Sequence, residues 1–144
     1  MAQIPLIQLI YRSDLVGRRE TEMASILQSC HYHNKINGIT GMLLYSDGSF
    51  LQVLEGQPED VHETFDRICR DPRHCNIVFM TEEGVEERSF AHWSMGYMHL
   101  GPEQVAQFPK YARFFQFGFS ASELRDNPGT SQELFQMFRG SAQD

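Results

Sequence analysis

The segment "GITGMLLYSDGSFLQVLEG", residues 38–56, decides the fold because it has the pattern of two β-strands joined by a tight turn. Apolar residues dominate both halves, and the "DG" pair at 47–48 is one of the stronger short signals for a hairpin. Gln52 interrupts the second strand. Since side chains alternate between the two faces of a strand, Gln52 shares a face with Phe50 and Leu54. We therefore predict a hairpin that carries a primary amide on an apolar face.

The amide of Gln52 needs hydrogen-bond partners wherever it is buried. A primary amide that leaves water without gaining such partners costs roughly 1–3 kcal/mol. Its NH2 group donates and its carbonyl accepts, so two kinds of partner are required. Backbone groups would satisfy it as an ordinary core residue, and a bound polar ligand would satisfy it as a site residue. The strand alone leaves both interpretations open.

Periodic segments on both sides of the hairpin extend the pattern to a whole domain. Residues 4–13 alternate as a strand, and Met23, Ile26 and Cys30 have the spacing of an amphipathic helix. The predicted elements are, in order, a strand at 4–13, a helix at 19–32 that ends near Asn34, strands at about 38–46 and 49–56, a helix from Pro58 to about Arg70, and strands at 76–83 and 92–100.

This order, β-α-β-β-α-β-β, is typical of an α+β fold: a ferredoxin-like sandwich with a five-stranded mixed sheet and two helices on one face. On the last strand, Trp93, Met95 and Tyr97 are expected to share a face. We expect residues 1–100 to form one domain and residues 101–144 to form a C-terminal helical extension that packs on the sheet or on a partner. The sheet face opposite the helices is apolar, and either this extension or a second copy of the chain would cover it.

Charge and composition argue against several classes of protein. The chain has 144 residues, 41% of them hydrophobic and 22% charged, as a soluble globular domain does. Its net charge of −7 and the lack of a basic stripe argue against direct nucleic-acid binding. No apolar run approaches the roughly 20 residues that cross a bilayer, so we expect no membrane contact and a cytoplasmic location. The three cysteines fit no metal or disulfide spacing, and His31 and His33 do not face each other on a helix, so no metal site is expected.

Polar residues recur where the two helices would meet the sheet. Each alone has an ordinary explanation, such as a core tyrosine for Tyr11, a helix cap for Asn34 or a dipole partner for Arg67. Together they would line the groove between the helices, where one planar polar ligand could meet them all. The residues are Tyr11, His33, Asn34, Gln52, Arg67, Asp71, Arg73 and His74.

Four segments, in this order and at these spacings, resemble the BLUF domain, a family of blue-light sensors that use flavin. They are "LIYRS" at 9–13, "NKINGITGMLLYSDGSFLQVLEG" at 34–56, "VHETFDRICRDPRH" at 61–74 and "FAHWSMGYM" at 90–98. The long second segment is far more specific than any short motif. The resemblance covers residues 4–100, and the remainder is similar to the C-terminal helices of short, single-domain members.

The resemblance implies a noncovalent FAD, with FMN and riboflavin as alternative flavins, inserted between the two helices. It implies that Tyr11 donates an electron and a proton to the excited flavin, that Gln52 stands between Tyr11 and the flavin, and that Trp93 and Met95 form a mobile pair. A static role for Trp93 as a core anchor remains the alternative. The photoactive residues would be Tyr11, Gln52, Trp93 and Met95, and the flavin contacts Tyr11, Ile26, His33, Asn34, Ile39, Phe50, Gln52, Leu54, Arg67, Asp71, Arg73 and Met95.

The function that the resemblance implies is a blue-light photoreceptor rather than an enzyme. Electron and proton transfer from Tyr11 would let Gln52 rotate or tautomerise, which would shift the flavin spectrum slightly red until it recovers in the dark. A separate signalling protein would read the change, and homo-oligomers are expected. Two alternatives are a flavin-free ferredoxin-like interaction module and an acylphosphatase-type hydrolase, although the phosphate-cradling loop of the hydrolase is missing.

Overall fold

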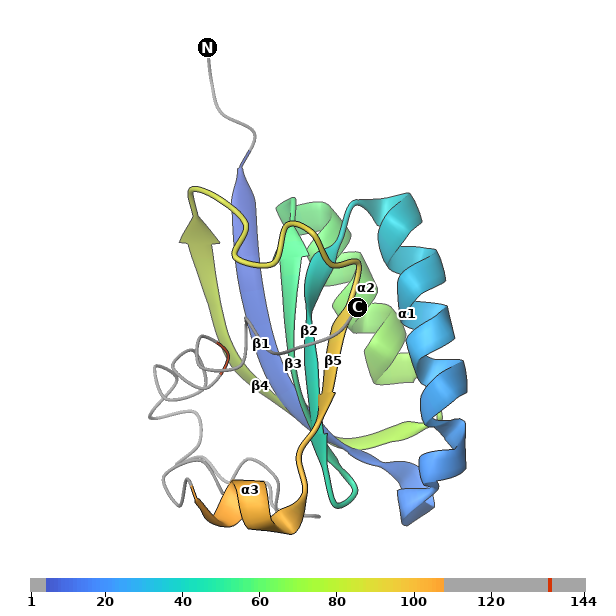
Figure 1. Ribbon diagram of the computed structural model, residues 1–144. Helices are drawn as coiled ribbons and strands as arrows, with labels where there is room; N and C mark the ends of the chain where they lie inside the picture. The colour runs from blue at the N-terminus through green and yellow to red at the C-terminus, as the bar shows by residue number, and fades with distance from the viewer. Residues whose placement is uncertain (1–4, 108–134, 136–144) are drawn as a thin grey trace.

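The computed structural model describes residues 5–107 and residue 135 as an α+β sandwich (Figure 1). The two long helices, α1 and α2, lie together on one face of a five-stranded sheet. Its elements are β1 (Leu6–Leu15), two short 3-10 turns (Val16–Arg18 and Glu20–Glu22), α1 (Met23–Asn37), β2 (Thr40–Ser46), β3 (Ser49–Gly56), α2 (Pro58–Arg70), β4 (His74–Val85), β5 (Gly96–His99) and α3 (Pro102–Ala106).

The strand order in the sheet is β4-β1-β3-β2-β5. Strands β4, β1, β3 and β2 pair antiparallel with one another in the ferredoxin-like order, and β5 pairs in parallel with β2. The predicted mixed sheet is therefore confirmed. The predicted hairpin is also confirmed, with positive φ angles of 45° at Asp47 and 89° at Gly48. Two adjacent residues with positive φ give a turn whose twist matches that of the paired strands.

The first helix differs from its predicted bounds at both ends. Two 3-10 turns precede it, so it begins at Met23 rather than near residue 19. It runs beyond Asn34 to Asn37, because Gly38 adopts a left-handed φ of 66° and its N–H bonds the Asn34 carbonyl. Glycine takes this conformation without the steric penalty that other residues meet, and it ends the helix there.

The last strand is shorter than predicted, and its face assignment is wrong. Only Gly96–His99 pair with β2, so Trp93 and Met95 lie in the connection before the strand. Trp93 packs with the side chains opposite the helices, whereas Met95 packs on the helix side together with Tyr97. The indole lies so close to Gly96 that a Cβ there would be 2.8 Å from Trp93 Cε3. An irregular chain does not alternate its side chains as a strand does, and the pair therefore separates to opposite faces.

Each face of the sheet has its own apolar core. On the helix side, Tyr11, Phe50 and Leu54 belong to one cluster of buried residues. On the other side, Phe90 packs edge to face against Phe135, with ring centroids 6.3 Å apart. Of the predicted extension at 101–144, the structure describes residues 101–107, which contain the short helix α3, and Phe135, which is 2% exposed; the rest lies outside the described residues.

A buried ion pair lies on the face opposite the helices. Arg12 Nη2 is 2.6 Å from Asp14 Oδ1, and both side chains are fully buried. Ser49 Oγ and Asn76 Nδ2 also donate to the Asp14 carboxylate, at 2.7 and 2.9 Å. Asn76 has a positive φ of 49°, and β1 and β4 change register on either side of Arg12. The network thus ties β1, β3 and β4 together beside Tyr11.

Asp14→Ala should lower the free energy of unfolding by about 3–5 kcal/mol, because it removes the carboxylate that neutralises a buried guanidinium. Urea unfolding of the variant beside Glu87→Ala, which truncates an exposed carboxylate, measures the difference. A loss below about 1 kcal/mol in Asp14→Ala would contradict a structural role for the pair.

Candidate functional site

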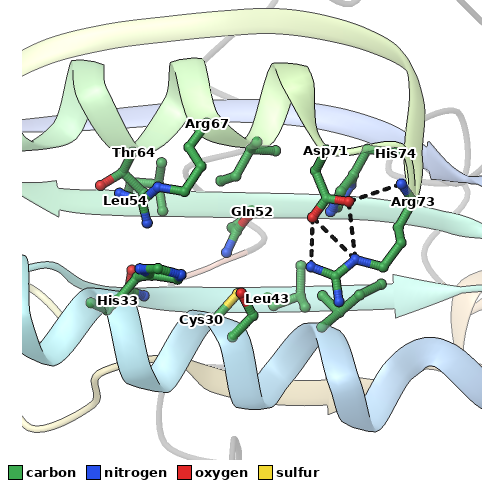
Figure 2. A pocket seen from close by; sticks show the side chains of 14 residues that line it. Cys30, His33, Leu43, Gln52, Leu54, Thr64, Arg67, Asp71, Arg73 and His74 are labelled. Atoms are coloured by element: carbon green, nitrogen blue, oxygen red, sulfur yellow. Dashed lines mark hydrogen bonds and ion pairs between the residues drawn. The ribbon is translucent and has the colours of Figure 1, made fainter.

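A groove between α1 and α2 lies over the middle of β3 (Figure 2). In this view Thr64 and Arg67 of α2 face His33 and Cys30 of α1, with Gln52 between them. The groove brings together eight residues that the resemblance predicted: Ile26, His33, Asn34, Gln52, Leu54, Arg67, Asp71 and Arg73.

The other predicted residues do not line the groove. Tyr11, Ile39, Phe50 and Met95 lie in the same helix-side core but behind or beside it. Trp93 lies on the opposite face of the sheet.

Further lining residues were missed as site residues, although the sequence held a signal for most of them. Cys30 and Ile68 belong to the apolar stripes of the two helices, and those stripes face the groove. Leu43 is the cross-strand partner of Gln52 in the hairpin. His74 was among the polar residues expected near the groove. No pattern identified Ser29 or Thr64, since a small polar residue on a helix is equally common at the surface.

A hydrogen-bonded chain of three buried side chains runs behind the groove, and Gln52 is the member that lines it. Tyr11 and Gln52 are directly paired across β1 and β3, and both are almost fully buried. The Tyr11 hydroxyl donates to Gln52 Oε1, and Gln52 Nε2 donates to Met95 Sδ at 3.3 Å. The amide of Gln52 is therefore hydrogen-bonded at both ends, to Tyr11 of β1 and to Met95 in the connection before β5.

The phenol and the thiol beside Gln52 both keep their protons at neutral pH. Burial, followed by the charges of Cys30 and nearby acidic groups, raises the pKa of Tyr11 well above its ordinary value. Burial raises the pKa of Cys30 to about 11, although a hydrogen bond with Gln52 acts in the opposite sense. Both groups are thus neutral, and Tyr11 has a proton to give.

Asn34 connects α1 to the residues before β5. Its Nδ2 donates to the Ser94 carbonyl at 2.7 Å, and the side chain is 2% exposed. One turn earlier, His31 Nδ1 is 2.6 Å from Ser94 Oγ. Both contacts hold the residue next to Met95 against the helix.

An ion pair borders the groove at the end of α2. Arg73 donates to both carboxylate oxygens of Asp71, the shortest distance being 2.6 Å from Nη2 to Oδ2, and its Nη1 donates to Ser25 Oγ of α1 at 2.7 Å. Arg73 follows α2 in the chain and therefore links the end of that helix to α1; Figure 2 shows its contacts with Asp71. Burial opposes the charge of Asp71, but the bonds from Arg73 outweigh it and lower the pKa of the carboxyl.

The donors and walls of the groove fit a flavin. Amide and guanidinium groups such as Asn34 and Arg67 can donate to the carbonyl edge of an isoalloxazine ring, while Ile26 and Leu54 offer apolar contact to its faces. The cavity has a volume of about 40 Å³, which is too small for a three-ring group, so a flavin enters only if the side chains that line the groove move apart.

Comparison with known proteins identifies the family. The family model described as "Sensors of blue-light using FAD" matches residues 6–96. The chain belongs to the BLUF family. Its members bind FAD as the chromophore through which they sense blue light, so the predicted family, fold and cofactor are confirmed.

Curated relatives match the BLUF region of this chain. The blue light- and temperature-regulated antirepressor BluF of Escherichia coli (strain K12) is 37% identical over 94 residues, which cover 62% of this chain and 23% of that protein. The photoactivated adenylate cyclase subunit alpha of Euglena gracilis is 33% identical over 103 residues, 71% of this chain and 10% of that protein. The chain thus spans about a quarter or less of these relatives.

Solved BLUF structures match nearly the whole chain. BlrB in its dark state is 28% identical with a TM-score of 0.75, covering 97% of this chain and 99% of that one. BlsA in its photo-activated state is 30% identical with a TM-score of 0.71, covering 90% and 94%. Within residues 5–107 and at 135, no helix is long and apolar enough to span a membrane and no cluster of ligands could hold a metal.

His74 should make the stability of the protein depend on pH. Burial lowers its pKa to about 4, and its Nδ1 lies 3.0 Å from Ser13 Oγ. Between pH 6.5 and 4 the unfolded chain binds a proton that the folded protein does not, so the free energy of unfolding falls as the pH drops through this range. His74→Gln should remove up to about 3 kcal/mol of that pH-dependent loss.

Urea unfolding at pH 7 and pH 4.5 with the same total flavin measures this contribution. The control is His92→Gln, which replaces an exposed imidazole and should behave as the parent protein does. Equal pH dependence in His74→Gln and the parent protein would contradict a buried neutral His74.

Proposed function

We propose that this BLUF protein is a light-operated switch in which Gln52 exchanges its hydrogen-bond partners and a separate protein reads the change. The observation that carries the proposal is the chain of buried contacts from Tyr11 through Gln52 to Met95 behind the groove. The family match disfavours both the hydrolase and the flavin-free alternatives. Self-association and a cytoplasmic location remain predictions.

The residues that would hold flavin are those on either side of Gln52. Asn34 and Arg67 would bond its polar edge, Ile26 and Leu54 would pack on its ring, and Arg73 would close the groove beside it. Bound flavin supplies the absorption of blue light and an excited state that takes up an electron. His33, Asp71, Ile39 and Phe50 complete the proposed shell, the last two from behind the groove.

Tyr11 is the proposed source of that electron and of the proton that follows it. Its hydroxyl is neutral, buried and bonded to Gln52 Oε1, so the proton is already directed at the amide. When the phenol gives up this proton, Gln52 Oε1 loses its donor. The carbonyl and the NH2 group are nearly isosteric, so the amide can exchange ends without needing new volume.

Met95 would couple the orientation of the Gln52 amide to the segment before β5. A thioether sulfur accepts weak hydrogen bonds but has no proton to donate. In the observed orientation it accepts from Gln52 Nε2, whereas after rotation it would face Oε1 and the bond would be lost. The rotation would therefore release the segment that Asn34 and Gln52 hold, and a partner protein could recognise the released form.

The relatives support this class of output. The name of the E. coli relative, an antirepressor, describes action on a second regulatory component, and the Euglena relatives are cyclase subunits that match over about a tenth of their length. We therefore assign sensing rather than catalysis to the BLUF region, and we propose a protein partner for its signal.

Gln52→Leu should keep flavin in the protein but abolish the light-induced red shift, because leucine fills a similar volume and offers no hydrogen bond. Absorption spectra before and after blue light measure the shift. Gln28→Leu, which replaces an exposed amide on α1, serves as the control and should retain it. A full shift with dark recovery in Gln52→Leu would overturn the proposal.

A further inference from the structure

Glu55 is a fully buried carboxylate on β3 whose partners are all donors. Oε2 accepts from Gln8 Nε2 at 3.0 Å and from the Ser89 N–H at 2.8 Å. Oε1 accepts from Thr40 Oγ1 at 3.1 Å and from the Phe90 N–H at 2.9 Å. Each oxygen thus has one side-chain and one backbone donor, which only a carboxylate can satisfy completely.

Arg88 provides the cation beside this buried charge. Its Nη1 donates to the Glu55 backbone carbonyl at 3.2 Å and to Thr40 Oγ1 at 2.9 Å. Glutamate is rarely buried to this extent unless such partners surround it. The Glu55 carboxylate therefore holds the backbone N–H groups of Ser89 and Phe90 in place.

The anchored residues begin the segment that ends at Met95. Residues 89–95 form the last part of the β4–β5 connection and end at Met95, which accepts a hydrogen bond from Gln52. In between, the Gly41 N–H bonds the Trp93 carbonyl at 3.2 Å and the Trp93 N–H bonds the Phe90 carbonyl at 3.0 Å. Strand β3 therefore holds both ends of one segment, through Glu55 on one face and Gln52 on the other.

Phe90, at the fixed end of the segment, contacts two other aromatic rings, one of them in the C-terminal part of the chain. The Phe90 ring stacks on Trp93 with centroids 5.9 Å apart and an angle of 27°. The same ring meets Phe135 edge to face. If Phe90 stays in place while the bond at Met95 breaks, the residues between them, Trp93 included, are the ones free to move.

We propose that Glu55 is a positioning residue that fixes Ser89 and Phe90, so that a switch of Gln52 displaces Trp93 relative to Phe90 and Phe135. This inference rests on the proposed function, since it needs the Gln52–Met95 bond to change in the light. Glu55 itself lies outside the groove and touches no proposed flavin contact through its carboxylate.

Hydrogen exchange in the flavin-loaded parent protein tests the anchor directly. In blue light the Trp93 amide should exchange at least tenfold faster than in the dark, while the Ser89 and Phe90 amides keep their dark rates to within twofold. Faster exchange of all three amides in the light, by similar factors, would overturn the anchoring role.

Glu55→Gln tests the coupling. Its NH2 group would face two of the four donors, so one backbone contact is lost. The flavin red shift should remain, while the light-induced change in the fluorescence of Trp93, the one tryptophan in the chain, should fall at least twofold. Glu87→Gln, an exposed carboxylate in the same connection, should keep both signals.

The two readouts separate the two proposals. A full Trp93 signal together with the red shift in Glu55→Gln would contradict the role of Glu55. A red shift in the parent protein without any change at Trp93 would contradict it as well. If the parent protein shows no red shift, the proposed function itself fails. Should Glu55→Gln not fold, the exchange measurement on the parent protein still decides the matter.

Discussion

The amide of Gln52 lies in an apolar core, and each of its two polar ends needs a partner there. Tyr11 meets one end and Met95 the other, so the amide joins β1 to the segment before β5. The Tyr11 hydroxyl can donate or accept, but the Met95 sulfur can only accept. In the proposed switch, this asymmetry would give the protein two unequal states from one rotation of the amide.

Side chains of β3 alternate between the two faces of the sheet, so this one strand contacts both the groove and the backbone of Ser89 and Phe90. Gln52 and Leu54 point toward the helices, whereas Val53 and Glu55 point to the opposite face. The groove on one face and the residues Ser89 and Phe90 on the other are therefore only one strand thickness apart. Coupling between them needs no long pathway, because the same backbone holds both ends of the segment.

The fold and the place of Tyr11 and Gln52 on its helix-side face could be predicted from the sequence, but the path of residues 89–95 could not. Periodicity and the turn at 47–48 predict the hairpin and the order of elements because these signals are local. Alternation wrongly placed Trp93 and Met95 on one face, since the chain is irregular until Gly96. The role of Glu55 was invisible because its backbone partners are 34 and 35 residues away in the sequence.

The most direct test is nuclear magnetic resonance of the flavin-loaded protein labelled with 15N in glutamine side chains. The Gln52 signal is the one missing from Gln52→Leu. The account predicts that the two Nε2 proton resonances of Gln52 move on illumination, return at the rate of the flavin spectrum, and leave the exposed Gln28 unchanged. A reversible red shift with unmoved Gln52 resonances would contradict the central claim.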